Sequence, residues 1–247
     1  MTLLDVRGVG KSFGGVRALT DISFEVMAGE IVGIMGANGA GKTTLFSLIA
    51  GHERPSAGGI VFAGRPLRGL RPHEICRLGV ARTFQIVRPF GGLTVADNVV
   101  TAALFGAKRA KSAEAAALRS RQVLELVGLA ERSQDLAETL TLSGQKRLEL
   151  ARAVATGGTL LMLDEVMAGL TPTEVAAMIE IIRRLHQQYG LTILIIEHVM
   201  RALMQLAERI IVLHHGELIG QGSPAAIGAD PRVLACYFGT DENDRAA

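Results

Sequence analysis

The 247-residue chain lacks the features that would mark a secreted or membrane-spanning protein. Its two cysteines, Cys76 and Cys236, lie far apart and match no metal-binding or redox spacing. This pattern predicts reduced thiols in a cytosolic protein. Although 49% of the residues are hydrophobic, apolar runs such as residues 191–196 are far shorter than the roughly 18 residues of a membrane-spanning helix. Residues 1–10 also lack a signal-peptide pattern.

Charge imbalance is also missing from the sequence. The formal net charge is only +2, because 26 basic residues are interspersed with 24 acidic ones. Without a basic arm, we expect no nucleic-acid partner. No internal repeat, low-complexity segment or linker divides the chain, so residues 1–247 are predicted to form a single domain with a substantial core.

Short apolar segments predict an α/β fold. Residues 3–9 and 22–26 have strand patterns separated by glycine-containing turns, which predicts an antiparallel N-terminal layer. Further along, three apolar strands alternate with helices, as a mainly parallel sheet requires. These strands are expected at residues 160–163, 191–196 and 210–213.

Helical patterns dominate the middle of the sequence, at residues 94–157. They predict a helical subdomain, approximately residues 89–157, inserted into a core of residues 1–88 and 158–247. One later helix has clear start signals, because Thr171 precedes Pro172 and Glu174 follows as the third residue of a capping box.

The strongest chemical signal is a glycine-rich turn between a predicted strand, residues 31–35, and a predicted helix, residues 42–50. The turn fits G-x-x-x-x-G-K-[ST], the P-loop motif. Glycines let successive backbone N–H groups point at phosphate oxygens, and the helix adds its positive dipole end. We expect Lys42 to contact the β- and γ-phosphates, Thr43 to bind Mg²⁺ and Thr44 to add a phosphate contact. The predicted nucleotide-binding residues are Gly36, Ala37, Asn38, Gly39, Ala40, Gly41, Lys42, Thr43 and Thr44.

A P-loop also needs a carboxylate for its metal ion, and an apolar strand ending in Asp164 and Glu165 supplies one. Asp164 is predicted to bind Mg²⁺, and Glu165 to orient and deprotonate the attacking water. An apolar strand that ends in two acids is weak support alone, since many strands end in acidic turns. Together with the P-loop it predicts a P-loop NTPase core that hydrolyses ATP.

Over nearly its whole length the chain resembles the nucleotide-binding subunits of the ATP-binding cassette family. Three further residues carry the resemblance. Phe13 matches the aromatic residue that stacks on adenine, and Gln85 matches the glutamine that contacts Mg²⁺ and the nucleophilic water. His198 matches the switch histidine that contacts the γ-phosphate. The resemblance therefore implies catalytic roles for Glu165, His198 and Gln85, and metal contacts for Thr43, Gln85 and Asp164.

Two segments depart from the family pattern. The family's D-loop position is residues 168–171, where Thr171 replaces the commoner aspartate. Directly after Asp164 and Glu165, Val166 replaces the proline that is frequent there. The LSGGQ signature is represented either by residues 142–145 or, at the family spacing, by residues 140–144. In both registers, small and hydroxyl residues that include Ser143 and Gly144 precede a helix predicted at residues 146–155. They are expected to face the nucleotide of a partner subunit.

Four phrases resemble the branched-chain amino acid importer branch of the family. They lie at residues 82–85, 94–99, 167–172 and 231–239. Urea and short amides are other solutes of that branch, and no residue of this chain selects the solute, which the permease and a solute-binding protein would choose.

The resemblance implies a dimer of two cassettes, equal or related, that closes over two ATP molecules. It also implies integral permease subunits and a peripheral location on the cytoplasmic face of the inner membrane. Three alternatives share the nucleotide motifs: a soluble non-transport cassette ATPase, a lipopolysaccharide-export ATPase, and a nucleotide sensor without turnover.

Overall fold

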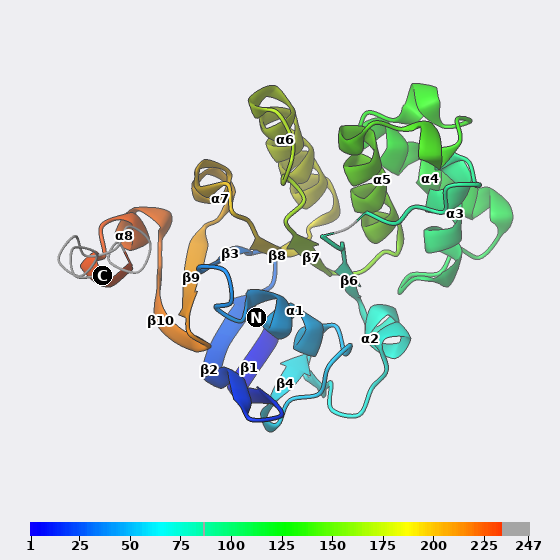
Figure 1. Ribbon diagram of the computed structural model, residues 1–247. Helices are drawn as coiled ribbons and strands as arrows, with labels where there is room; N and C mark the ends of the chain where they lie inside the picture. Colours follow the sequence, from blue (N-terminus) through cyan, green and yellow to red (C-terminus); the bar gives the residue numbers. More distant parts are fainter. Residues whose placement is uncertain (86, 234–247) are drawn as a thin grey trace.

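Two β-sheets and their covering helices build the protein, as a computed structural model that describes residues 1–85 and 87–233 shows (Figure 1). The larger sheet has the strand order β10-β9-β3-β8-β7-β6, and the smaller sheet has the order β2-β1-β4-β5. Cys236 lies outside the described residues, and so does the part of the 231–239 phrase that follows residue 233.

Five parallel strands form the centre of the larger sheet, and β10 is antiparallel at its edge. The mainly parallel sheet predicted from the sequence is confirmed. The strands are β3 (Ile31–Met35), β6 (Val80–Arg82), β7 (Leu160–Asp164), β8 (Thr192–Ile196), β9 (Arg209–His214) and β10 (Glu217–Gly222).

Side chains of the central strands alternate between two hydrophobic cores. In β8, Ile193 and Ile195 belong to one core, whereas Leu194 and Ile196 belong to the other. All five residues of β8 are buried, as are all five of β3 and of β7. Strands covered on both faces have near-continuous apolar sequences, which is why these segments were recognisable as short apolar runs.

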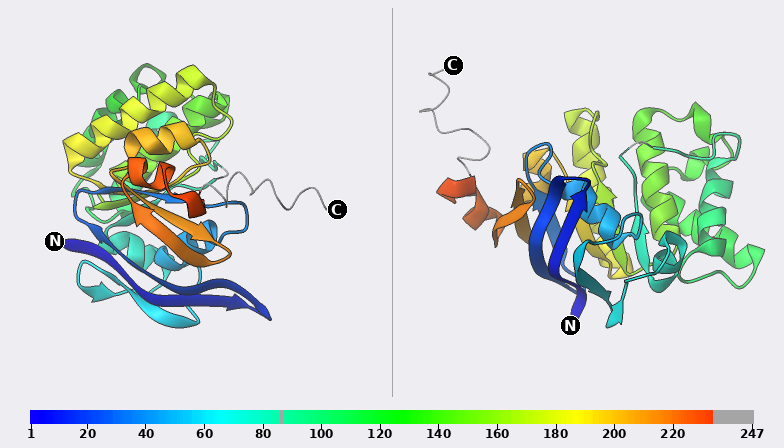
Figure 2. Two further views of the ribbon diagram at one scale, coloured as in Figure 1. Left: turned by 90° about the vertical axis from the view of Figure 1, so that its left-hand side faces the viewer. Right: turned by 60° about the horizontal axis from the view of Figure 1, so that its bottom comes forward.

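The smaller sheet is antiparallel and covers one face of the larger one, with helix α1 (Lys42–Ile49) between them. It confirms the predicted antiparallel layer, but its strands are longer and more numerous than predicted. They are β1 (Thr2–Phe13), β2 (Val16–Met27), β4 (Ala57–Phe62) and β5 (Arg65–Pro66). Figure 2 shows this layer on the side opposite the long helices.

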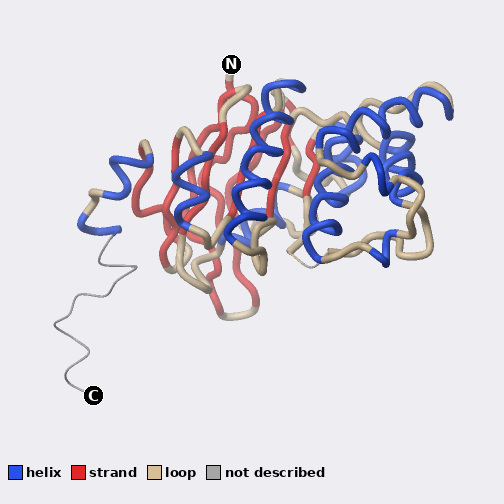
Figure 3. Tube along the Cα trace, turned by 90° about the horizontal axis from the view of Figure 1, so that it is seen from above, coloured by secondary structure: helices blue, strands red, loops and turns tan. Residues whose placement is uncertain are grey.

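Helices α6 (Pro172–Tyr189) and α7 (Met200–Leu206) cover the other face, where they lie side by side and run along the strands (Figure 3). The predicted capping box at the start of α6 is confirmed, because the Thr171 hydroxyl accepts from the Glu174 amide and the Glu174 carboxylate accepts from the Thr171 amide. Short helices α2 (Pro72–Leu78) and α8 (Pro224–Gly228) lie near opposite edges of the larger sheet.

Three helices gather beyond the β6 edge of the larger sheet, at one end of the molecule. They are α3 (Val95–Phe105), α4 (Ala113–Leu126) and α5 (Leu142–Ala155), with short 3₁₀ turns at Ala130–Arg132 and Ala137–Thr139. The mainly helical character predicted for residues 94–157 is confirmed. Within residues 1–85 and 87–233, no helix is long and apolar enough to cross a membrane.

Candidate functional site: the P-loop cavity

The glycine-rich turn lies between β3 and α1, and two of its glycines are sterically required. A Cβ atom on Gly36 would lie 2.5 Å from the carbonyl oxygen of Leu213. Gly41 has φ +100°, and a Cβ atom there would lie 2.6 Å from the Leu19 side chain. Larger residues would be strained at both positions. Since no side chain caps α1 and its first turn has no acid, its N-terminus suits an anion.

Lys42 begins α1 and is buried. Its ammonium group donates to the carbonyl oxygens of Gly36, at 2.6 Å, and of Ala37, at 3.0 Å. Burial lowers the pKa of this ammonium, while the nearby carboxylates of Glu165 and Asp164 act to raise it. The lysine therefore lies within the turn, close to both acids that the sequence assigned to hydrolysis.

Asp164 ends β7, and its side chain is paired with an arginine whose side chain is only 9% exposed. The residue is only 2% exposed, and its Oδ2 accepts from the guanidinium of Arg82 at 2.8 Å. Arg82 comes from the neighbouring strand β6 and also donates to the Ser47 hydroxyl on α1, at 3.3 Å. The Thr83 hydroxyl accepts from the Asp164 amide at 3.1 Å. These contacts fix the position of the carboxylate at the end of the strand.

Glu165 follows directly, and both of its carboxylate oxygens are held by side chains. Gln85 donates through Nε2 to Oε2 at 2.7 Å, and Nε2 of His198 lies 2.8 Å from Oε1. The three residues come from three separate segments: the one after β6, the one after β7 and the one after β8. The carboxyl ends of these parallel strands meet at one edge of the sheet, so the side chains converge there.

A cavity of about 280 Å³ joins these segments to the P-loop. Its lining residues are Ala18, Asn38, Gly39, Ala40, Gly41, Lys42, Thr43, Thr44, Gln85, Glu165 and His198. The structure thus brings together most of the residues predicted for nucleotide binding and for catalysis, although they are spread over more than 150 positions of sequence.

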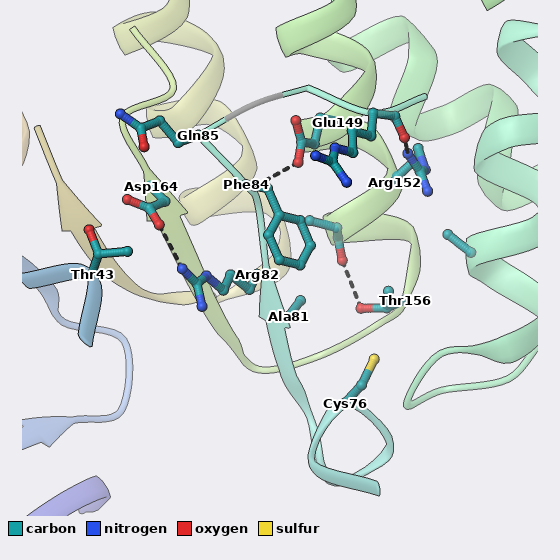
Figure 4. Close-up of a pocket in the computed structure, with 13 residues that line it drawn as sticks. Thr43, Cys76, Ala81, Arg82, Phe84, Gln85, Glu149, Arg152, Thr156 and Asp164 are labelled. Carbon is teal, nitrogen blue, oxygen red and sulfur yellow. Dashed lines mark hydrogen bonds and ion pairs between the residues drawn. The ribbon is translucent and has the colours of Figure 1, made fainter. Parts of the chain in front are cut away.

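A second cavity, of about 610 Å³, lies between the larger sheet and the helices α3 and α5 (Figure 4). Thr43, Gln85 and Asp164 line one end of it, and Thr43 and Gln85 line the smaller cavity as well. Next to Gln85, the Phe84 amide donates to Glu149 of α5 at 2.6 Å. Gln85 therefore stands between the P-loop and the helical part of the molecule.

Six predicted site residues do not line the P-loop cavity in the described part of the chain. Gly36 and Ala37 belong to the P-loop itself and Asp164 ends β7, whereas Phe13, Ser143 and Gly144 lie in other segments. Phe13 lies at the end of β1 with 46% of its surface exposed, and the Lys11 ammonium lies 4.5 Å from its ring centre. Ser143 and Gly144 lie in the first turn of α5, where Ser143 is buried. On a single chain Phe13, Ser143 and Gly144 are separate from the P-loop.

The predicted start of α5 at residue 146 is wrong, because the helix begins four residues earlier, at Leu142. Thr141 is its N-cap, and its hydroxyl accepts from the Gly144 amide at 3.3 Å. The error has a physical reason: the third helical position carries glycine, so the acid that completes a capping box is missing from the sequence. Ser143 and Gly144 belong to the helix and do not precede it.

Sequence reasoning missed three charged residues with little exposed surface around Glu165 and Asp164. Lys146 and Glu197 are buried, and the side chain of Arg82 is 9% exposed. Lys146 donates to the backbone carbonyl of Glu165 at 2.9 Å, and Glu197 accepts from the Met167 amide at 2.8 Å. Buried charges are rare unless they have partners. However, a sequence does not reveal which charged residues are buried, so nothing distinguished these three from surface residues.

Comparisons with known proteins agree with this geometry. The profile of the ABC transporter family matches residues 19–168. The high-affinity branched-chain amino acid transport ATP-binding protein LivG of Salmonella typhimurium is 39% identical, over 96% of this chain and 98% of LivG. BraF of Pseudomonas aeruginosa, a protein with the same description, is 35% identical over the same shares.

Solved structures give the same result. The ADP conformation of an ATP-binding cassette of an ABC transporter superposes with a TM-score of 0.86 at 26% identity, over 97% of this chain and all of that one. A nucleotide-free cassette gives a TM-score of 0.85 at 25% identity, over the same shares. The chain belongs to the ABC transporter family, and it is one of that family's nucleotide-binding ATPases.

Proposed function

We propose that this chain hydrolyses ATP in the P-loop cavity to power the import of branched-chain amino acids or related small solutes. The observation that carries the proposal is the convergence of Gln85, Glu165 and His198 on the P-loop in one cavity. The solute class is supported by LivG and BraF, which match nearly the whole chain and are themselves named for branched-chain amino acid transport.

In this proposal the P-loop binds the triphosphate. The backbone amides of residues 36–44 and the N-terminus of α1 donate to phosphate oxygens, and Lys42 contacts the β- and γ-phosphates. Phe13 stacks on the adenine ring, which its half-exposed position at the end of β1 would permit.

The donor set around Thr43 suits Mg²⁺, which prefers oxygen ligands and usually shares its coordination with substrate phosphates. The hydroxyl of Thr43, the carboxylate of Asp164 and the amide of Gln85 line the same cavity. The described residues contain no group of three or more His, Cys, Asp or Glu side chains that could hold a metal ion by themselves. We therefore assign the metal contacts to Thr43, Asp164 and Gln85 together with the nucleotide, and Mg²⁺ would neutralise phosphate charge there.

Hydrolysis needs a base beside the attacking water, and Glu165 is the proposed base. Gln85 and His198 hold its two oxygens at 2.7 and 2.8 Å, which fixes the direction of the carboxylate before a water is bound. After water enters, Gln85 would help to orient it and His198 would contact the γ-phosphate. A base aligned in this way contributes about 10²- to 10⁴-fold to a rate.

A second cassette, identical or related, would complete the site. Ser143 and Gly144 at the start of α5 would face the γ-phosphate bound by the partner chain. This explains why they lie away from the P-loop of their own chain, and it makes the dimer the active form. ATP binding would close the dimer, and hydrolysis with phosphate release would open it.

The second, larger cavity supports a membrane partner. Phe84, Phe90 and Phe105 are large exposed aromatic residues at or near it, and Arg152 stacks on Phe90 at 4.7 Å. We propose that a cytoplasmic helix of the integral permease docks over these rings and moves Gln85. The chain would then lie on the cytoplasmic face of the inner membrane, with a solute-binding protein as an indirect partner.

The decisive experiment is to isolate the full chain from its native membrane and identify the integral subunits that accompany it. The isolated complex, reconstituted in vesicles, should couple ATP hydrolysis to the uptake of radiolabelled leucine, isoleucine or valine. A complex that hydrolyses ATP but accumulates none of these would overturn the solute assignment, and recovery without any integral subunit would overturn the transport role.

The docking surface has its own matched test. Phe105→Asp places a charge on the proposed surface, whereas Leu118→Asp does so at another exposed position of the helical region, on α4. We expect only the Phe105 variant to lose the integral subunits during purification. Equal retention in both variants would exclude this surface as the docking site.

A further inference from the structure

The turn after β7, which carries the residue proposed as the base, has an unusual backbone conformation. Glu165 has φ +51°, in the left-handed region that residues other than glycine rarely adopt. Such a conformation is strained and persists only where its surroundings enforce it. The contacts that enforce it therefore also determine where the Glu165 carboxylate points.

Lys146 holds this turn from the helical region. It lies in α5, is only 5% exposed, and its ammonium donates to the Glu165 carbonyl at 2.9 Å. Burial lowers the pKa of Lys146, while the carboxylates of Glu197, Glu149 and Glu165 act to raise it. A buried ammonium is costly, and here it is directed at the backbone of the turn.

Glu197 holds the same turn from the opposite direction, at the end of β8. Its Oε1 accepts from the Met167 amide at 2.8 Å, and it is also only 5% exposed. Among the described residues, its Oε2 has no hydrogen-bond partner. Burial raises the pKa of Glu197 to about 7, against the lowering effects of the Met167 amide and Lys146.

The residue after Glu197 is His198, which contacts the Glu165 side chain. Residues 197 and 198 thus hold the turn twice, once through the Met167 amide and once through the Glu165 carboxylate. The Glu165 amide also donates to the Ile196 carbonyl at 3.0 Å. The last residue of β8 and the two residues that follow it therefore fix this turn, and Lys146 holds it from α5.

We propose that Lys146 and Glu197 are positioning residues, which hold the backbone of residues 165–167 from two sides and so aim the Glu165 carboxylate at the attacking water. This inference rests on the proposed role of Glu165. Because Lys146 belongs to α5, a shift of the helical region moves the Glu165 carbonyl directly. The position of α5 is thereby coupled to the geometry of hydrolysis without any contact between Lys146 and the nucleotide.

The test compares variants that remove each contact with variants that keep it. Lys146→Met and Glu197→Leu remove the hydrogen bonds, while Lys146→Arg keeps a donor and Glu197→Gln keeps an oxygen acceptor. Lys111→Met and Glu208→Leu make the same changes at exposed positions and serve as controls. Each variant is measured in the full transporter complex for kcat, for KM and for ATP affinity.

We expect the two removing variants to lose roughly 10- to 100-fold in kcat, because a displacement of about 1 Å at a reacting group costs that much. Their ATP affinity should stay within about twofold of wild type, since neither residue is proposed to touch the nucleotide. The conservative variants should recover most of kcat, and the controls should match wild type. If Lys146→Met does not fold, the Glu197 pair carries the test alone.

Unchanged kcat in both removing variants would overturn the inference and leave the proposed function intact. Equal losses in Glu197→Gln and Glu197→Leu would also overturn it, since the hydrogen bond would then not be what matters. A wild-type complex that does not hydrolyse ATP would instead overturn the proposed function, and this inference with it.

Discussion

The starts of α1 and α5 form an instructive pair, because each follows a loop and lacks an acid in its first turn. The other long helices differ, with Asp97, Glu114 and Glu174 in the first turns of α3, α4 and α6. Acids at these positions satisfy a helix N-terminus internally. Among the helices of eight or more residues in the described chain, α1 and α5 are therefore the two whose N-termini remain suited to an outside anion.

The two starts differ in how complete they are. No side chain caps α1, and the glycine turn before it lines the P-loop cavity. Helix α5 has a cap, because the Thr141 hydroxyl occupies the Gly144 amide. The comparison supports the proposal that α1 binds phosphate within one chain, whereas α5 would complete a site that another chain has begun.

Each helix also carries a buried lysine near its start, and the two lysines have different targets. Lys42 donates to carbonyls of its own loop, and Lys146 donates across to the Glu165 carbonyl. One lysine is thus available to a ligand that enters the loop. The other is committed to the turn that carries the proposed base.

The largest expected effect separates hydrolysis from ATP binding in the P-loop cavity, which α1 begins. Glu165→Gln should keep ATP binding but lower the rate of hydrolysis by roughly 10²- to 10⁴-fold, because the proposed base is lost while the P-loop and Lys42 are unchanged. It should also favour the closed dimer. Phosphate release, nucleotide binding and gel filtration with ATP check these outcomes, with Glu208→Gln as a surface control.

Lys42→Ala should instead remove ATP binding itself. Hydrogen bonds to charged groups contribute about 1.5–3 kcal/mol, so we expect affinity to fall at least roughly tenfold to a hundredfold. Titration with a fluorescent ATP analogue measures the change. Equal loss of binding in this variant and in Glu165→Gln would contradict the separate roles of the two residues.

A pair of glycine substitutions sharpens the comparison between the two helix starts. Gly41→Ala would place a side chain at a φ of +100° and against Leu19. It should lower the free energy of unfolding by about 1–3 kcal/mol and also weaken ATP binding. Gly144→Ala meets only the Leu140 side chain, with its Cβ at 3.2 Å, and should fold nearly normally. Denaturant unfolding and ATP titration of both variants test this, and similar losses at the two sites would refute the contrast.

Thr141→Val removes the hydroxyl cap of α5 with little change in size. Loss of an N-cap costs about 0.5–2 kcal/mol, so the melting temperature should fall by a few degrees, whereas Thr141→Ser should restore it. ATP affinity of the single chain should not change. A reduced affinity in the monomer would show that α5 acts on the nucleotide of its own chain, against the view taken here.

The smallest effect concerns the pH dependence of stability and the turn of residues 165–167, which Glu197 contacts. Since burial raises the pKa of Glu197 from 4.5 to about 7, the folded state favours the protonated form. The stability due to Glu197 is therefore present below pH 4.5 and is lost as pH rises to about 7. Glu197→Gln stays neutral, so its melting temperature relative to wild type should rise by a few degrees between pH 5 and 8. A constant difference across this range would contradict the raised pKa.

Much of the fold was predictable because buried parallel strands have a simple sequence pattern. The apolar segments at residues 31–35, 160–164 and 192–196 are covered on both faces, and the P-loop lies directly between one of them and a helix. The capping box at Thr171 was equally legible, because all of its contacts are local. The division at residues 88/89 and 157/158 remains a prediction.

The less regular parts of the fold and site were not predicted, for physical reasons. Strands β4, β5 and β10 are short or partly exposed, so their apolar pattern is weak. Strand β4 also pairs with the distant β1, for which the sequence has no local signal. The start of α5 was misplaced because its cap lacks the usual acid. Arg82, Lys146 and Glu197 were missed since their partners lie 82, 19 and 30 positions away.

By itself, the sequence determined the phosphate-binding turn, the two acids that follow a buried strand, and the layered α/β architecture, because each depends on neighbouring residues and on the burial of apolar side chains. Only the tertiary structure decided which charged groups surround Glu165. Parallel strands bring residues 85, 165 and 198 to one edge of the sheet, and burial places Lys146 and Glu197 behind them. Strand order and burial are properties of the whole fold, so no local segment could have specified them.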